Sequence, residues 1–449
     1  MRVSGVGFGS LSMLRLALGV AALLASDDIQ ATSDGKDPAD LVVAYFQTSE
    51  LKARRRLAEE IDDAYQGVID RVAQAVRDAR LWTPLPERVG SLSFAGRTTD
   101  NIEVSYQLPL GYDASTPWPV IIIAGEGDDT FSFEQVSEQL GGLADGFILL
   151  HPRPWIGGSF EQSPAAAADF RRFIRYVRQT FHTDTDRLYL YGRGVGGDAA
   201  WMSGIMHPDL FAGIVVFDSY PKVPFAEQLY PIILPNLASL PVLSIWSDPP
   251  PGILAGRANA VAVHNRAIVE FAGAASLPIE GIALSGDVSK SATAEAQHKL
   301  LSRRRRSDRV AVSHWFRYPV QGHAGWFRQS KFLGEAWTAD QLSILPGLSV
   351  DRDTFIGDVI RGRLAYLGGR RDGDSFRLET RKCAGVTLSL PLGEVDPGRP
   401  VTVYCNGKRR HAGAITPSTR TLLTHAYRTW DMQNFVVAEI SFSIRQDRP

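Results

Sequence analysis

The sequence contains only two cysteines, Cys383 and Cys405, among its 449 residues. So few cysteines exclude a small disulfide-rich scaffold, and neither has the cysteine or histidine neighbours that a structural zinc site needs. A disulfide formed in an oxidising compartment and two buried thiols are equally compatible with the sequence. We therefore predict no metal site and no cofactor, and the state of the two thiols stays open.

The chain also lacks an excess of charge of either sign, with a formal net charge of -1. A near-neutral chain has little electrostatic attraction to nucleic acid or to anionic membranes. Its one basic run, four arginines at residues 303–306, lies in a polar stretch. We interpret this run as a solvated loop rather than a phosphate grip, and we predict no nucleic-acid partner.

A hydrophobic run long enough to span a membrane comfortably is missing. The N-terminal apolar stretch, residues 14–25, is short and is interrupted by Arg15. Because it follows Arg2 and ends in small residues, it is typical of a secretory signal peptide. We expect removal of residues 1–26, export to the periplasm or the extracellular space, and no integral membrane span afterwards. An uncleaved anchor and a misassigned start codon are the alternatives.

Residues 27–86 are predicted to form a helical arm. Apolar residues recur there at spacings of three and four, which places them on one helix face; they are Leu57, Ile61, Tyr65, Val68, Val72 and Val76. The arm either packs on the region that follows or serves as an exposed oligomerisation helix.

The rest of the chain divides into two patterns. In residues 87–345 short apolar runs, the last at 314–320, alternate with amphipathic helical segments. That alternation predicts an α/β fold with a mostly parallel sheet covered by helices on both faces. In residues 346–449 the helical patterns stop, and strand-like segments are separated by turn signals such as Asn406-Gly407. These signals predict a small β-rich C-terminal domain.

A strand-turn-helix pattern lies in the middle of the α/β region. An apolar run at residues 188–191 leads into Gly-Arg-Gly-Val-Gly-Gly at 192–197, and His-Pro-Asp-Leu-Phe follows at 207–211. This pattern resembles the α/β-hydrolase superfamily, in particular esterases and prolyl-oligopeptidase-like peptidases, over about residues 119–327. There a strand runs into a sharp Gly-x-Ser-x-Gly elbow whose glycines permit close packing. The resemblance implies an α/β-hydrolase-like sheet.

The C-terminal region adds a second likeness. Residues 396–408 read Asp-Pro-Gly-Arg-Pro-Val-Thr-Val-Tyr-Cys-Asn-Gly-Lys. Together with the helical arm and the hydrolase-like core, this segment resembles exported hydrolase-like proteins of planctomycete-type bacteria. It is a strand-turn signature, and we assign it no catalytic role.

The resemblance places Gly194 at the position of the nucleophilic serine. Glycine tolerates the positive φ of an elbow, but it has no hydroxyl and can form no acyl-enzyme. The family's order of nucleophile, acid and base implies Asp248 as a possible acid and His323 as a possible base. Asp248 falls two positions early, with Pro250 in the expected place. A loop cap at Asp248 and a pocket or core role for His323 therefore stay open.

The oxyanion hole of the family is only partly recognisable. The resemblance implies backbone N–H donors at Gly125, after a buried strand, and at Val195, after the nucleophile position. Such donors could hold a carbonyl or carboxylate oxygen without any chemistry. The acidic neighbours Glu126 and Asp128 make an anion less favourable there.

The same turn satisfies a dinucleotide-binding fingerprint. Gly192, Gly194 and Gly197 give G-x-G-x-x-G between a strand and a helix, and Asp218 lies about 20 residues later, where a ribose-binding acid would lie. The fingerprint normally opens its fold, whereas here several strand-like runs precede it. We therefore place this interpretation behind the hydrolase one.

The favoured hypothesis is an exported α/β-hydrolase-fold protein that has lost serine hydrolase activity, whose pocket binds a small molecule or a peptide-like ligand or serves as a scaffold. Whether the chain is an enzyme stays undecided. The alternatives are an active esterase or peptidase with a non-standard site, and a dinucleotide-binding protein.

Overall fold

The computed structural model describes residues 37–97, 101–125, 131–155, 163–223, 225–248, 256–284, 290–305, 310–333, 352–394, 396 and 398–444. The chain divides into two units, Met1–Asp37 and Pro38–Pro449. All elements below belong to the second unit. The predicted signal peptide, residues 1–26, lies outside the described residues.

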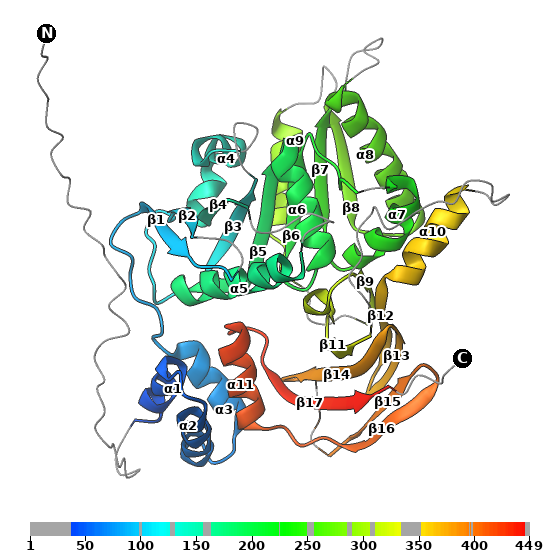
Figure 1. Ribbon diagram of the computed structural model, residues 1–449. Coiled ribbons are helices and arrows are strands. Elements are labelled where there is room, and N and C mark those ends of the chain that lie inside the picture. The colour runs from blue at the N-terminus through cyan, green and yellow to red at the C-terminus, as the bar shows by residue number, and fades with distance from the viewer. Residues whose placement is uncertain are drawn as a thin grey trace, which may run out of the picture. The chain divides into compact units, whose positions relative to one another are not determined.

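An eight-stranded sheet forms the first layer of the structure (Figure 1), with strand order β1-β2-β4-β3-β5-β6-β7-β8. Its strands are β1 (Val89–Phe94), β2 (Ile102–Gln107), β3 (Trp118–Ala124), β4 (Ile148–Arg153), β5 (Thr183–Arg193), β6 (Gly213–Phe217), β7 (Val242–Ser247) and β8 (Ile279–Leu284). The pairs β1–β2 and β2–β4 are antiparallel, and every other pair is parallel.

Helices cover both faces of this sheet, as the α/β pattern predicts. Because side chains alternate along a strand, Val120 and Ile122 of β3 enter one core and Ile121 and Ile123 enter the other. The first core includes side chains of α5 (Pro164–Thr180), α6 (Gly194–Met206), α7 (Ala226–Ile233) and α8 (Arg257–Ala274). The second includes those of α4 (Phe133–Leu140) and α9 (Lys290–Leu301). The prediction of a mostly parallel, doubly covered sheet is confirmed.

The segment before the sheet folds as three helices, α1 (Pro38–Gln47), α2 (Leu51–Ala64) and α3 (Ile69–Asp78). Their apolar faces share one core with α11 (Thr419–Thr429), which contributes Leu422, Leu423 and Ala426. The arm thus packs within the same unit, against a helix from the opposite end of the sequence.

Two smaller sheets make up the C-terminal β-rich part. One has the order β10-β11-β14-β17 and the other β16-β15-β13-β12-β9. Their strands are β9 (Ala311–Phe316), β10 (His323–Ala324), β11 (Phe327–Phe332), β12 (Ala365–Asp372), β13 (Ser375–Arg381), β14 (Cys383–Pro391), β15 (Pro400–Cys405), β16 (Lys408–Ala414) and β17 (Val436–Ser443). Their inward side chains share one apolar core.

Two details differ from the sequence-based expectation. The apolar run expected as the last strand of the α/β region is β9, and it pairs with β12 of the C-terminal sheet, for example Phe316 with Ala365. Its pattern showed that it is a strand but not which edge it joins, because pairing is a non-local choice. The C-terminal region also contains two helices, α10 (Arg352–Arg363) and α11.

Both cysteines are buried free thiols in the structure, Cys383 on β14 and Cys405 on β15. Burial raises the pKa of Cys383 to about 12, so it stays a neutral thiol at physiological pH. In the described part of the chain no helix is both long enough and apolar enough to cross a bilayer.

Candidate functional site

The glycine-rich segment forms a sharp turn between β5 and α6. Gly194, the first residue of α6, has φ +54°, a left-handed conformation that costs glycine little and other residues more. The preceding residue, Arg193, has extended backbone angles and ends β5. The chain therefore turns from strand to helix within one residue.

The neighbouring glycines are required by close packing. A Cβ atom on Gly192 would lie 2.5 Å from the carbonyl oxygen of Gly196, and one on Gly196 would lie 2.1 Å from the carbonyl oxygen of Ala124. On Gly197 it would lie 2.3 Å from Oγ of Ser219. These three positions bring α6 against β3, β5 and the end of β6, which is what an elbow needs.

A sharp glycine turn after the fifth strand, in a mostly parallel sheet with helices on both faces, decides the fold type. The fold is that of an α/β hydrolase. The glycine spacing that also fits a dinucleotide fingerprint is explained here by the turn itself: Gly192 packs against Gly196, Gly197 packs against Ser219, and Gly194 has a positive φ. The turn follows the fifth strand of the sheet, whereas dinucleotide folds carry the fingerprint in their first βα turn.

Three of the solved structures that resemble the chain are named as two esterases and a putative aminopeptidase. A thermostable esterase matches 49% of this chain and 64% of its own, at 14% identity and a TM-score of 0.35. A putative dipeptidyl aminopeptidase IV from Bacteroides ovatus matches 48% of this chain and 36% of its own, at 14% identity and a TM-score of 0.37. An esterase from the planctomycete Thermogutta terrifontis matches 49% of this chain and 95% of its own, at 14% identity and a TM-score of 0.34.

No protein-family model matches the chain, and no curated protein matches it either. The chain spans less than two thirds of the first two solved structures, so their activities are not transferred to it.

The acidic candidates at the carboxyl ends of the strands are held by other groups. Asp248, directly after β7, forms an ion pair with Arg266 of α8. Asp218, directly after β6, accepts a hydrogen bond from the backbone N–H of Ser247 at 2.9 Å, and its second oxygen lies 3.9 Å from Nε of Arg193. Pro250, which occupies the expected acid position, lies outside the described residues.

The two oxyanion positions lie on either side of the turn. Gly125 follows β3 with φ +118°, and its carbonyl oxygen is 3.3 Å from Nε2 of His151. Val195 is 54% exposed, so its side chain points to solvent at the top of the turn. Glu126 and Asp128 lie outside the described residues.

The structure does not bring His323 to the Gly194 turn. His323 begins β10 of the C-terminal four-stranded sheet, where it pairs with Arg328 of β11. It lines a cavity together with Asp209, which lies beyond the far end of α6. Since the 13 residues of α6 span about 20 Å, Gly194 and His323 lie at opposite ends of this helix. His323 lies away from the turn because β9, which precedes it, pairs with β12 in a different sheet.

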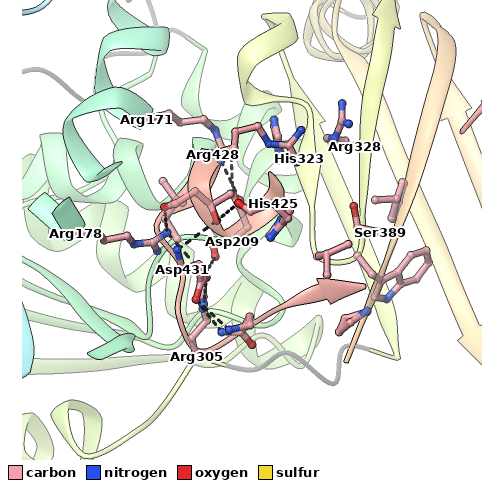
Figure 2. Close-up of a pocket in the computed structure, with 18 residues that line it drawn as sticks. Arg171, Arg178, Asp209, Arg305, His323, Arg328, Ser389, His425, Arg428 and Asp431 are labelled. Atoms are coloured by element: carbon pink, nitrogen blue, oxygen red, sulfur yellow. Dashed lines mark hydrogen bonds and ion pairs between the residues drawn. The ribbon is translucent and has the colours of Figure 1, made fainter. Parts of the chain in front are cut away.

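The cavity around His323 contains an unusual set of charged side chains (Figure 2). It has a volume of about 180 Å³. Five arginines line it: Arg171, Arg178, Arg305, Arg328 and Arg428. Two histidines, His323 and His425, and two carboxylates, Asp209 and Asp431, complete its polar lining together with Ser389, Thr429 and Asn434.

Each cavity carboxylate is held by an arginine. Arg171 donates two hydrogen bonds to Asp209, at 3.0 and 2.7 Å, and Arg305 donates one to Asp431 at 2.5 Å. Burial alone would raise the pKa of Asp209, but Arg171 outweighs it and holds that pKa well below its ordinary range. Arg305, together with Arg178, does the same for the pKa of Asp431 against its burial. Both carboxylates are therefore ionised at neutral pH.

The two cavity histidines are neutral. Burial, and next the Arg428 guanidinium, lowers the pKa of His425 to about 4. Burial and the nearby Arg171 hold the pKa of His323 well below its usual range, against the opposing effect of Asp209. At neutral pH both imidazoles offer one donor and one acceptor nitrogen.

Sequence reasoning missed most of this cavity. Arg171 and Arg178 lie seven residues apart on α5, a spacing that puts both on one face of the helix, and that was the available signal. Arg305 was interpreted as part of a solvated basic loop; this is wrong for its side chain, which is 10% exposed and bonded to Asp186 and Asp431. Among the residues that the structure describes, no group of histidine, cysteine and acidic side chains is arranged to hold a metal ion.

Proposed function

We propose that this chain is an exported α/β-hydrolase-fold protein without serine hydrolase activity, which acts by binding a ligand. One observation carries the proposal: the turn that holds the nucleophile in such folds is present, with φ +54° at its tip, but its tip residue is Gly194. The turn offers no hydroxyl to attack a substrate.

The surroundings of the turn support the same conclusion. His151, which contacts Gly125 beside the turn, has both ring nitrogens engaged: Nε2 with the Gly125 carbonyl oxygen and Nδ1 with Arg153 at 3.2 Å. Burial lowers its pKa to about 4. A histidine tied in this way is a poor general base, because a base needs a free nitrogen within reach of the nucleophile.

An assay with short p-nitrophenyl esters and a fluorophosphonate probe tests the proposal. We expect the purified wild-type protein to neither turn over the esters nor take up the probe. We expect the same of the Gly194→Ser variant, because restoring the hydroxyl does not bring a base to it. A mock purification from the same host without the gene serves as the control, since turnover in that sample points to a contaminating hydrolase.

Two results would contradict the proposal. Ester turnover by the wild type that is absent from the mock purification would show an active, non-standard site. Probe labelling gained only in Gly194→Ser would show that a base and an oxyanion hole remain assembled, so that the chain lost one hydroxyl and not the site.

Export rests on the sequence pattern of residues 1–26. Expression in a bacterial host followed by N-terminal sequencing of the periplasmic protein tests it. We expect the mature chain to begin close to Asp27. Recovery of the full-length chain from the cytoplasm alone would contradict export.

A further inference from the structure

The cavity around His323 is assembled from segments that are far apart in the sequence. Arg171 and Arg178 come from α5, Arg305 follows α9, and Arg328 and Arg428 come from β11 and α11. None of these elements takes part in the Gly194 turn. The cavity is therefore a second site, separate from the one that the fold type suggests.

The cationic groups of this cavity outnumber the anionic groups that face them. Within the described residues, four carboxylates accept contacts from the five arginines: Asp186, Asp209, Asp431 and Glu439. Glu439 is shared by Arg328 and Arg428, at 3.5 Å from each. Arg428 and Arg328 repel each other, and after burial this repulsion is the next cause of the lowered pKa of Arg428. A surplus of positive charge remains, and both histidines are neutral.

Several donors in the cavity have no partner within the described residues. The side chain of Arg178 is 3% exposed, yet its Nε and one Nη atom make no hydrogen bond. Its other Nη donates to the carbonyl oxygen of Thr429 at 3.3 Å and lies 3.9 Å from Asp431. The Nε atoms of Arg171 and Arg328 are likewise buried and unpartnered. Buried guanidinium donors without acceptors are costly, so they point to a missing acceptor.

The remaining wall of the cavity is apolar. Trp326 and Phe327, both buried, lie between the cavity and the core of the C-terminal sheets, and Pro391 and Val436 face it from β14 and β17. Arginines on one side and aromatic rings on the other suit a molecule with an anionic end and an apolar end. A volume of about 180 Å³ limits that molecule to a small one.

We propose that this cavity binds a small molecule that carries a carboxylate or a phosphate group next to an apolar part. The oxyanion accepts hydrogen bonds from Arg178 and from the free donors of Arg171 and Arg328, because planar guanidinium groups pair well with such oxyanions. This site goes beyond the proposed function and stands separately from it: hydrolase activity at the Gly194 turn would leave it untouched.

A purely structural network of ion pairs is the competing explanation. Such a network would leave the protein indifferent to added anions beyond the general effect of salt. A binding site would instead show saturable binding and a stabilisation that grows with ligand concentration. These two behaviours can be told apart by experiment.

The test is isothermal titration calorimetry on the intact protein with inorganic phosphate, phenyl phosphate and benzoate, each against sodium chloride at matched ionic strength. We expect saturable one-site binding of at least one of the two aromatic anions, and tighter binding of phenyl phosphate than of inorganic phosphate. Preference for phenyl phosphate over benzoate assigns a phosphate ligand, and the reverse assigns a carboxylate. No saturable binding of any of the three would overturn the proposal.

Two variants locate the binding. We expect Arg178→Met, which removes the unpartnered buried donors, to weaken binding by about tenfold or more. Because this variant could fold poorly, Arg428→Gln, at a side chain that is 48% exposed, is the second variant, and we expect it to weaken binding as well. Arg399→Gln is the matched control, since Arg399 is 69% exposed and does not line the cavity. Equal affinity in all four proteins would overturn the assignment.

A spectroscopic readout separates ligand contact from a loss of fold. We expect the anion to raise the pKa of His425 in the wild-type protein, because it offsets the positive charge of Arg428, and NMR titration of the histidine ring measures this. A His425 pKa that does not change at saturating ligand would contradict binding in this cavity.

Discussion

Arg171 and Asp209 form a two-point ion pair between α5 and the segment that follows α6, with N–O distances of 3.0 and 2.7 Å. Both side chains are largely buried, at 17% and 18% exposed. The pair lies beside His323 of β10, and all three residues line the same cavity. It also fixes one wall of the arginine-lined cavity.

Loss of one partner of this pair should be costly. We expect Arg171→Met to lower the free energy of unfolding by about 3 kcal/mol, because it leaves the Asp209 carboxylate buried without its cation. Urea unfolding measures this. The control is Arg56→Ala, which removes an exposed pair with Glu60 on α2 and should cost less than about 0.5 kcal/mol. Equal losses in the two variants would show that the Arg171–Asp209 pair contributes no more than a surface contact.

The buried histidines should make the protein acid-sensitive before its carboxylates titrate. A histidine in the unfolded chain has a pKa of about 6.5, whereas burial lowers the pKa of His425 in the folded protein to about 4. Between these values the unfolded chain binds a proton that the folded chain does not. Stability is therefore fully present above about pH 6.5 and falls as the pH is lowered towards 4.

Thermal unfolding of His425→Gln across this pH range checks the sign. We expect the variant to lose less stability than the wild type between pH 7 and 4, by about 1–2 kcal/mol. Above pH 7 we expect the free energy of unfolding to depend on pH in the same way in both proteins. The matched control is His298→Gln, an exposed histidine of α9, which should keep the wild-type slope. A steeper acid loss in His425→Gln than in the wild type would refute the assignment.

The three closely packed glycines of the turn, Gly192, Gly196 and Gly197, should tolerate no side chain. We expect Gly196→Ala to lose about 2–3 kcal/mol of stability, because its Cβ would meet the carbonyl oxygen of Ala124 at 2.1 Å. Gly273→Ala on α8 is the control; nothing lies within 4 Å of its Cβ, and alanine favours a helix by up to about 1 kcal/mol. If chemical denaturation shows Gly196→Ala to be as stable as the wild type, the packing account is wrong.

The dinucleotide hypothesis predicts that the turn binds a nucleotide cofactor, and our interpretation of the turn predicts that it does not. We expect no saturable binding of NADH or FAD, because Asp218, its ribose-binding candidate, already accepts from Ser247. Titration followed by fluorescence measures this. Micromolar binding that weakens in Asp218→Asn would instead establish a nucleotide site at the carboxyl end of β6.

The hydrolase-like layer could be predicted from the sequence because the patterns that indicate it are local. Alternating strand and helix patterns set the parallel sheet, and the glycine spacing at 192–197 set the sharp turn. These features depend on residues a few positions apart, so one sequence suffices to read them. The identity of Gly194, which offers no hydroxyl at the tip of the turn, is likewise a fact of the sequence alone.

The position of His323 depends on contacts between distant segments, so the order of residues along the chain predicted it wrongly. His323 follows an apolar strand, as a catalytic base would, but that strand pairs with β12 and carries His323 away from the turn. Strand pairing between distant segments depends on the packing of whole faces, which periodicity does not encode. The same reason hides the cavity, whose five arginines come from four separated segments.

The sequence by itself determined the fold type, the elbow turn and the absence of a hydroxyl at its tip, since each follows from neighbouring residues. Only the tertiary structure decided that His323 joins Arg171 and Asp209 at the other end of α6, and that Arg305 is buried rather than solvated. Ion pairs between distant segments form only after the layers have packed, because packing removes the water that would otherwise separate the charges.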